Sequence, residues 1–236
     1  MDPLTPGEVR VWVARPAAAS ARELARYRAL LSAEETERIA RFHFERHARE
    51  STVSRALVRL MLARFAGAPP ESFRYRLGHY GRQQVESHCG AWFNATHQHE
   101  LVACAVALTE EIGVDVEPLA RADEILEVAG TVFSPPELEA LALLPDGAAS
   151  RDRAVSLWTC KEAYIKARGL GFSAPLKEIV VEFPPGERPT IRFLSATDQS
   201  AGWWLDQRDL HGVRLAIAVR ASAEPRLIVE ELATSP

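Results

Sequence analysis

Apolar and polar residues alternate in two short segments that lie far apart along the chain, at positions 9–13 and 112–116. This alternation has the period of a β-strand, whose successive side chains point to opposite faces, and a proline follows each segment closely. Ser32 and Ser134 come about twenty residues after these strands and precede acidic residues, a pattern typical of a capped helix start. The pattern therefore predicts two strand-to-helix units of similar design.

A periodic helical stretch in each unit ends at a glycine, Gly67 in the first and Gly169 in the second. The distance from the capping serine to this glycine is 35 residues in both units. Further strands are predicted after the glycines and at the end of each half, at 73–77, 101–108, 179–183 and 214–219. The matched order predicts an α+β protein of two similar α/β lobes related by a pseudo-twofold axis, with residues 1–110 as the N-terminal lobe and 111–236 as the C-terminal lobe.

The overall composition is that of a folded protein of 236 residues, with 47% hydrophobic residues and a net charge of −4. The chain is too apolar for a disordered protein, and it lacks the basic excess that is typical of a nucleic-acid binder. No secretory signal and no apolar run long enough to cross a bilayer are found, and the three cysteines are too scattered for a disulfide framework. We therefore expect a soluble, cytoplasmic protein that binds neither nucleic acid nor membranes.

Two carboxylates, Asp115 and Glu117, lie two residues apart in the second alternating segment, within the sequence Gly-Val-Asp-Val-Glu. In a strand they point to the same side, roughly 6.5–7 Å apart, so both can converge on one cation. Neighbouring carboxylates repel each other unless a cation lies between them, and an all-oxygen donor set suits Mg²⁺ or Mn²⁺ better than zinc. The alternative is an edge strand with a solvated polar face, which is the more common explanation of such a pair on its own.

Lysine is rare in this chain: three of its 28 basic residues are lysines, Lys161, Lys166 and Lys177, and the first two lie in one helical segment. Trp158, Glu162 and Lys166 recur there at four-residue intervals and so share one helix face. Either Glu162 and Lys166 form an ordinary surface pair, or Glu162 is a third carboxylate or a base and Lys166 faces a phosphate. Trp158 is expected to pack in the core or between lobes.

Together these two segments resemble the Sfp-type 4′-phosphopantetheinyl transferases. The family pattern is a Gly-[Ile/Val]-Asp-x-Glu strand, followed about 40 residues later by a helix that reads Trp/Phe-x-x-Lys-Glu-[Ala/Ser]-x-x-Lys, and this chain carries both, at 113–117 and 158–166. A third segment, Phe-Asn-Ala-Thr-His at 93–97, is similar to the family's Asn-x-Ser-His, with threonine in place of serine. The resemblance covers the chain from Leu31 to about Leu176. It also implies a two-lobed monomer.

The resemblance implies an enzyme that transfers the 4′-phosphopantetheine arm of coenzyme A to a serine of an apo carrier protein and releases adenosine 3′,5′-bisphosphate. Asp115, Glu117 and Glu162 would hold Mg²⁺, with Mn²⁺ as the alternative, against the pyrophosphate of coenzyme A. Glu162 would also take the serine proton, directly or through a water, and Lys166 would stabilise charge on the phosphates. The sequence leaves open whether Glu162 acts as base, as metal ligand or as both.

Further contacts to coenzyme A are implied by matching family positions. Arg38 and Arg41 would lie near its 3′-phosphate, a group that arginine suits well, and Thr96 and His97 would contact its phosphate region. The segment 80–82 matches a family Gly-Lys-Pro block, with an arginine in the position of the lysine and a glutamine after it in place of the proline. The expected coenzyme A contacts are thus Arg38, Arg41, Gly81, Arg82, Thr96, His97, Asp115 and Lys166.

Two other functions remain open from the residues themselves: a different Mg²⁺-dependent phosphotransferase or hydrolase, and a non-catalytic module that binds coenzyme A or a carrier protein. The lack of a Walker loop argues against common versions of the first, and the complete acidic set with Lys166 argues against the second. The carrier partner could serve fatty-acid, polyketide or nonribosomal peptide synthesis, and by family analogy the two-lobed form favours broad or secondary-metabolic clients. Phe133 and the segment 121–144 are candidates for its docking surface.

Overall fold

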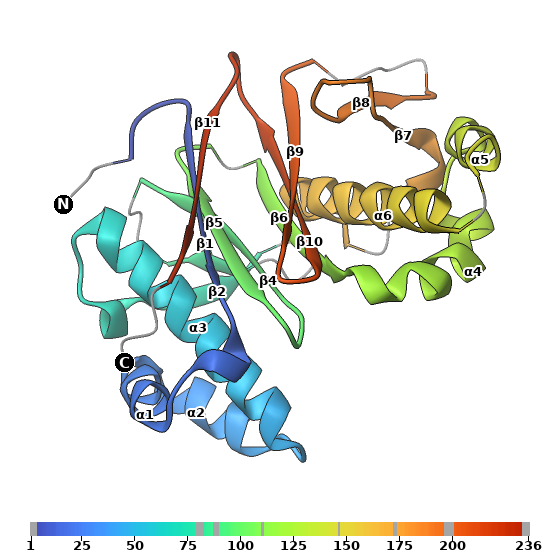
Figure 1. The fold of residues 1–236 in the computed structure, drawn as a ribbon. Coiled ribbons are helices and arrows are strands. Elements are labelled where there is room, and N and C mark those ends of the chain that lie inside the picture. Colours follow the sequence, from blue (N-terminus) through green and yellow to red (C-terminus); the bar gives the residue numbers. More distant parts are fainter. Residues whose placement is uncertain are drawn as a thin grey trace. The chain divides into compact units, whose positions relative to one another are not determined.

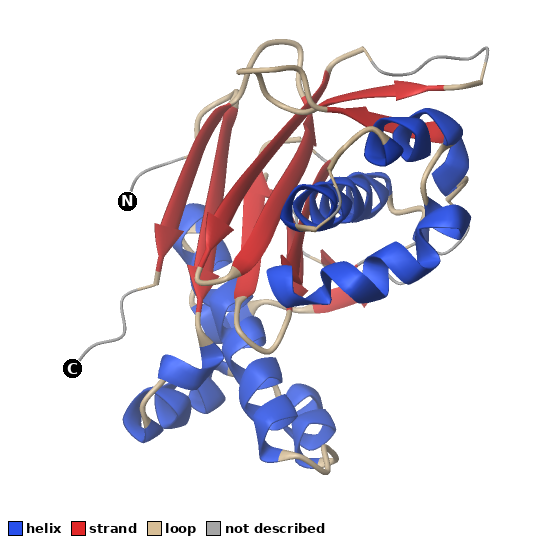
Figure 2. Ribbon diagram, turned by 45° about the vertical axis from the view of Figure 1, so that its right-hand side comes forward, coloured by secondary structure: helices blue, strands red, loops and turns tan. Residues whose placement is uncertain are grey.

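The structure is a computed structural model that describes residues 4–78, 83–86, 90–109, 111–145, 147–171, 174–195 and 201–232. Helices and strands both contribute to it, so the predicted α+β class is confirmed (Figure 1, Figure 2). The chain divides into two compact units, Met1–Glu110 together with Pro225–Pro236, and Glu111–Glu224. The pseudo-twofold relation between the lobes stays a prediction.

The described elements of the first unit are β1 (Glu8–Ala14), η1 (Pro16–Ala18), α1 (Ala21–Leu30), α2 (Ala33–Ala40), α3 (Glu45–Ala66), η2 (Pro70–Ser72), β2 (Tyr75–Leu77), β3 (Gln83–Val85), β4 (Trp92–His97), β5 (Val102–Ala107) and β11 (Arg226–Glu231). Its main sheet has the order β11-β1-β5-β4. The long helix α3 packs on this sheet with Val53, Leu57 and Met61, which are apolar at helical spacing and buried. β2 and β3 form a separate hairpin.

The end of the chain belongs to the first unit. Strand β11 pairs with β1 in parallel, from Glu8 opposite Arg226 to Val13 opposite Glu231. The predicted assignment of 111–236 to the second lobe is therefore wrong for residues 225–236. The physical reason is that the backbone groups of this last strand are satisfied at the edge of the first sheet, a distant pairing that leaves no local signal in the sequence.

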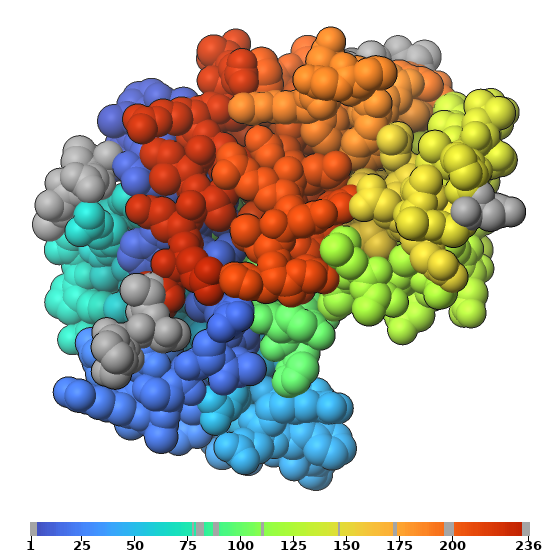
Figure 3. Space-filling model, viewed as in Figure 1, coloured from blue at the N-terminus to red at the C-terminus, as the bar shows by residue number. Residues whose placement is uncertain are grey.

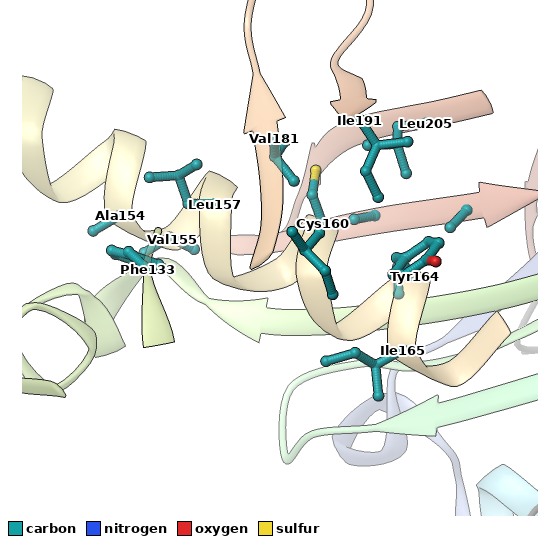
Figure 4. Packing of buried hydrophobic residues seen from close by; sticks show 14 of the residues in the cluster. Phe133, Ala154, Val155, Leu157, Cys160, Tyr164, Ile165, Val181, Ile191 and Leu205 are labelled. Atoms are coloured by element: carbon teal, nitrogen blue, oxygen red, sulfur yellow. The ribbon is translucent and has the colours of Figure 1, made fainter. Parts of the chain in front are cut away.

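The described elements of the second unit are β6 (Ile112–Pro118), η4 (Leu119–Arg121), α4 (Ala122–Val132), α5 (Pro135–Ala142), α6 (Ala148–Arg168), η6 (Leu176–Glu178), β7 (Ile179–Glu182), β8 (Thr190–Phe193), β9 (Trp203–Leu210) and β10 (Val213–Arg220). The main sheet has the order β6-β10-β9 and is antiparallel, and β7 pairs with β8. From α6, Cys160 and Tyr164 point toward the strands that carry Val181, Ile191 and Leu205 (Figure 4). This cluster is the core of the second unit.

Both units repeat the same local design. A capping box begins α2 at Ser32 and α5 at Ser134, as the sequence predicts. Helices α3 and α6 end at Gly67 and Gly169, whose φ angles of 66° and 62° are left-handed and therefore favour glycine. The sheet order β6-β10-β9 also repeats the order β1-β5-β4.

A buried ion pair recurs at the same place in both units. Oε2 of Glu35 lies 2.7 Å from Nη2 of Arg59, and Oε2 of Glu137 lies 2.6 Å from Nζ of Lys161. In each unit the carboxylate belongs to the capping box, and the cation follows it by 24 residues on the long helix. Shared caps, sheet order and ion pairs agree with the predicted duplication.

The long helices begin earlier than the apolar pattern indicates. Helix α3 starts at Glu45 rather than near Ser54, and α6 starts at Ala148 rather than near Leu157, because their first turns are polar and carry no apolar periodicity. Cys104 and Cys160 are free and buried, as expected for core thiols. Within the part of the chain that the structure describes, no helix is long and apolar enough to cross a membrane.

Candidate active site

Strand β6 and helix α6 approach each other closely because of a glycine. A Cβ atom on Gly113 would overlap the carbonyl oxygen of Ala163 and the amide nitrogen of Ala167, so no larger residue fits there. Since side chains alternate along a strand, Asp115 and Glu117 project on the same side as Gly113, toward α6. The glycine of the motif thus determines how near the two carboxylates lie to the helix.

The first contact across this interface joins Asp115 and Lys166. Nζ of Lys166 lies 2.5 Å from Oδ1 of Asp115. The carboxylate is buried, whereas the lysine side chain is 30% exposed. In this structure Lys166 is therefore the counter-ion of Asp115.

The second contact involves Glu117, which receives a donor on each oxygen. Nε1 of Trp158 donates to Oε1 over 2.9 Å, and Nη1 of Arg121 donates to Oε2 over 2.6 Å. Burial raises the pKa of the Glu117 carboxyl, the charge of Asp115 adds to this effect, and the Trp158 and Arg121 donors oppose it. Burial and the neighbouring Asp115 thus disfavour the ionised form of Glu117, and the Trp158 and Arg121 donors hold its two oxygens in place.

Glu162 lies on α6 one turn after Trp158 and one turn before Lys166. Burial raises the pKa of its carboxyl, the Lys166 ammonium opposes this, and the charge of Glu117 adds to it. Trp158 and Lys166 both reach carboxylates of β6, which confirms that the predicted face of α6 is directed at the acidic strand. The structure therefore brings Asp115, Glu117, Glu162 and Lys166 into one electrostatic cluster.

The cluster is not arranged as a metal centre in this structure. Among the residues that the structure describes, no group of three or more His, Cys, Asp or Glu side chains is placed to hold a metal ion. Side-chain cations lie against two of the carboxylates, Lys166 at Asp115 and Arg121 at Glu117. The donors still fit a divalent cation in their chemistry, because they are all carboxylates. Burial, and after it the charge of a neighbouring carboxylate, raise the pKa values of Glu117 and Glu162, and a bound cation would oppose both effects.

Lys161 belongs to the same motif but points away from this cluster. Its Nζ lies 2.6 Å from Oε2 of Glu137 and donates to the carbonyl oxygens of Val132 and Leu176. Burial lowers the pKa of the ammonium, and Glu137 opposes that effect. Lys161 therefore has a structural role, and of the two lysines of this segment only Lys166 lies at the acidic cluster.

In the first unit, His97 lies at a cavity of about 130 Å³. Ser51, Ser54 and Arg55 also line it, and Nε2 of His97 is 3.6 Å from Oε1 of Glu50. The cavity offers hydroxyl groups, a guanidinium and an imidazole, which are suitable donors for an anionic group. The carboxylate of Glu35 also lines it and lies 3.3 Å from Nη1 of Arg55.

Among the described residues, Thr96, Arg38 and Arg41 do not line this cavity. Thr96 is buried, and it faces the opposite side of β4 from its neighbour His97, because strand residues alternate. Arg38 and Arg41 are exposed on and just after α2, and Arg41 pairs with Glu37. The segment around residue 45 is light blue at the bottom of Figure 3. Gly81 and Arg82 lie outside the described residues.

Two site residues were not recognised from the sequence. Trp158 was expected to pack in the core or between lobes, but its indole nitrogen donates to Glu117. Its position one helical turn before Glu162 was the feature of the sequence that could have indicated this role. Arg121 was not singled out, and its four-residue spacing from Glu117 was hidden by the change from strand to helix at Pro118. The docking role considered for Phe133 is wrong, because this side chain is fully buried in the second core.

Comparisons with known proteins identify one family of enzymes. The family profile described as the 4′-phosphopantetheinyl transferase superfamily matches residues 111–218, and the profile described as 4′-phosphopantetheinyl transferase, N-terminal, matches residues 17–109. The 4′-phosphopantetheinyl transferase HetI of Nostoc sp. is 35% identical over 162 residues, which cover 67% of this chain and 68% of the relative. A 4′-phosphopantetheinyl transferase of Bacillus subtilis is 30% identical over 201 residues, covering 80% and 87% of the two chains.

Among solved structures, a holo-(acyl-carrier-protein) synthase of Bacillus anthracis in complex with CoA (3′,5′-ADP) is 21% identical, with a TM-score of 0.40. The match covers 48% of this chain and 96% of that chain.

The profile matches define an enzyme that transfers a 4′-phosphopantetheinyl group. The chain belongs to the 4′-phosphopantetheinyl transferase superfamily. Enzymes of this family transfer the 4′-phosphopantetheine arm of coenzyme A to a carrier protein, so the family, the enzyme class and the reaction predicted from the sequence are confirmed.

Proposed function

We propose that the transfer is carried out at the cluster of Asp115, Glu117, Glu162 and Lys166, with coenzyme A as the donor and a serine of an apo carrier protein as the acceptor. The observation that carries this proposal is the pair of contacts from one face of α6 to the two carboxylates of β6. These contacts bury two carboxylates, and burying charges costs free energy. A strand with a purely structural role would gain nothing from this arrangement, which supports a chemical role for the two carboxylates.

Asp115, Glu117 and Glu162 are the residues that would hold Mg²⁺, or Mn²⁺ in its place. When bound, the ion would neutralise charge on the pyrophosphate of coenzyme A. The burial of these carboxylates and their mutual repulsion support this assignment, since both effects favour a counter-cation.

Glu162 is proposed as the acceptor of the serine proton. Burial raises the pKa of its carboxyl, which makes it a better base than an exposed glutamate. The serine oxygen forms a bond to the β-phosphorus of coenzyme A, the bond from that phosphorus to adenosine 3′,5′-bisphosphate breaks, and the serine proton passes to Glu162. Lys166 lies beside Asp115 with a partly exposed side chain, and its ammonium is suited to stabilise the negative charge that leaves with the bisphosphate.

The anionic end of coenzyme A is proposed to bind residues of the first unit. His97 is supported by the donor-lined cavity beside it, and Arg38 and Arg41 by their exposed guanidinium groups. Thr96, Gly81 and Arg82 remain proposed contacts on the family pattern alone. Only backbone groups of Thr96 suit this role, since its side chain is buried on the other face of β4.

The proposed partners are carrier proteins of fatty-acid, polyketide or nonribosomal peptide synthesis, with secondary-metabolic clients favoured. We further propose that the protein acts as a cytoplasmic monomer. Each of the two units contains its own sheet and core, which supports a monomer that needs no second copy to complete its fold.

The proposal is tested by incubating the protein with coenzyme A and a panel of apo acyl, peptidyl and aryl carrier proteins, with Mg²⁺ or with a chelator, and by measuring intact masses. We expect at least one carrier to gain a phosphopantetheine mass with Mg²⁺ and none to gain it with the chelator. Transfer that persists in the chelator would remove the metal from the proposal. Hydrolysis of coenzyme A without any carrier modification would favour a hydrolase instead.

A further inference from the structure

Arg121 occupies an unusual position beside the proposed metal site. It is the last residue of η4, the short turn that follows β6, and its guanidinium reaches back to Oε2 of Glu117 over 2.6 Å. Its Nε lies 2.9 Å from Oε2 of Glu124 on the first turn of α4. The guanidinium is therefore held between a buried carboxylate of the cluster and an exposed carboxylate outside it.

The contact with Glu117 competes with any other cation for the same oxygen. Glu117 is 7% exposed, and its second oxygen already accepts from Trp158. A divalent ion that binds Oε2 of Glu117 must displace the Arg121 guanidinium or share the oxygen with it, and two cations at one carboxylate repel each other.

Arg121 can leave without disturbing a core. Its side chain is 37% exposed, and Glu124 offers it a second partner only one helical turn away. Displacement therefore costs one partly exposed ion pair rather than a buried group, so exchange between Arg121 and a metal ion is energetically accessible.

We propose that Arg121 is an internal counter-ion of Glu117 that competes with the divalent cation and so sets the affinity of this enzyme for its metal. The inference rests on the proposed function, because it assumes that Glu117 is a metal ligand. In the metal-free protein Arg121 compensates the charge of Glu117, and in the metal-loaded protein it keeps only its pair with Glu124.

The test measures the binding of Mn²⁺ to the purified protein without coenzyme A. Calorimetry and the electron paramagnetic resonance signal of free Mn²⁺ both give the dissociation constant. Arg121→Gln should bind Mn²⁺ roughly fivefold more tightly than the wild type, the upper range for one partly exposed ion pair. Arg121→Lys keeps the positive charge and should stay within about twofold of the wild type.

Arg151→Gln is the matched control. Arg151 pairs with Asp123 over 2.6 Å in the same unit, on the surface and outside the cluster. The Arg151→Gln variant loses the same positive charge as Arg121→Gln, so it corrects for any general effect of protein charge on Mn²⁺ binding. The Mn²⁺ affinity of Arg151→Gln should equal that of the wild type.

The outcomes separate this inference from the proposed function. Equal Mn²⁺ affinity in the wild type and in Arg121→Gln would overturn the role of Arg121 while leaving the metal site intact. The same tightening in Arg151→Gln would also overturn it, because the effect would then be one of net charge. Weaker binding in Arg121→Gln would show that Arg121 supports the site rather than competing with the metal. If neither protein binds Mn²⁺, the metal site of the proposed function is itself contradicted, and the inference is overturned with it.

Discussion

Lys161 and Glu137 form a buried ion pair, with 2.6 Å between Nζ and Oε2, inside the second unit. The lysine also donates to the carbonyl oxygens of Val132, at the end of α4, and of Leu176, in η6. It thereby ties three segments to the long helix α6. The corresponding pair of Arg59 and Glu35 in the first unit has the same placement, although that unit carries no acidic cluster on β1.

The first prediction follows from this pairing. Lys161→Met should destabilise the protein by about 3–5 kcal/mol, because it leaves the Glu137 carboxylate buried without its counter-ion. Urea unfolding measures this loss, and Lys177→Met, which changes an exposed lysine, serves as the control. The folded fraction of Lys161→Met should keep a kcat close to that of the wild type. A fully stable but inactive variant would show that Lys161 has a chemical role.

The second prediction concerns the close approach of β6 and α6. Gly113→Ala should cost several kcal/mol or prevent folding, because its Cβ would overlap backbone atoms of Ala163 and Ala167. Gly130 in α4 is the matched control, since a Cβ there meets no atom within 4 Å. Gly130→Ala should therefore be neutral or stabilise by up to about 1 kcal/mol. Thermal unfolding of both variants tests the difference, and a Gly113→Ala protein of normal stability would contradict the packing described here.

The starts and ends of helices were well predicted from the sequence, because the residues that determine them are neighbours in the chain. The serine caps at Ser32 and Ser134 and the glycine ends at Gly67 and Gly169 are short-range patterns with a direct physical cause, and the structure confirms them. The pairing of β11 with β1 was missed because it joins residues more than two hundred positions apart, and neither strand encodes its partner.

The candidate site was predictable in its residues but not in its contacts. The spacing of Trp158, Glu162 and Lys166 correctly indicates one helix face, yet only the packing of α6 on β6 shows that Trp158 donates to Glu117. The rarity of lysine drew attention to this helix but did not separate Lys161 from Lys166. Their different roles follow from the helical rotation between them, which turns one toward buried Glu137 and the other toward Asp115.

A third prediction addresses the indole of Trp158. Trp158→Phe keeps an aromatic ring but removes the donor to Glu117, so kcat/KM should fall by about tenfold while stability changes by less than about 2 kcal/mol. Trp204→Phe is the control, because Trp204 donates to the carbonyl oxygen of Ala221 away from the cluster. An equal loss of activity in both variants would show that the effect is general and not due to the hydrogen bond with Glu117.

A fourth prediction concerns pH. Burial raises the pKa of Glu162 above its usual 4.5, so its carboxylate form is lost at a higher pH than that of an exposed glutamate. In the metal-free protein, the titration of the Glu162 carboxyl carbon followed by NMR should accordingly have its midpoint above 4.5. Lys166→Met removes the charge that opposes this shift and should move the midpoint to still higher pH. A midpoint unchanged by Lys166→Met would contradict the coupling between Lys166 and Glu162.

The most direct test of the central claim is the rate at which Glu162→Gln transfers phosphopantetheine. The substrate is an apo carrier protein that the wild type modifies with coenzyme A and Mg²⁺, and the gain in its intact mass measures the rate. Glu139→Gln is the control, because it removes the same negative charge from an exposed residue of α5. The account predicts that Glu162→Gln folds normally and slows transfer by at least about 100-fold, the usual share of a general base, while Glu139→Gln transfers at the wild-type rate. Transfer by a folded Glu162→Gln protein within a few fold of the wild type would contradict the assignment of Glu162, and with it the proposed site.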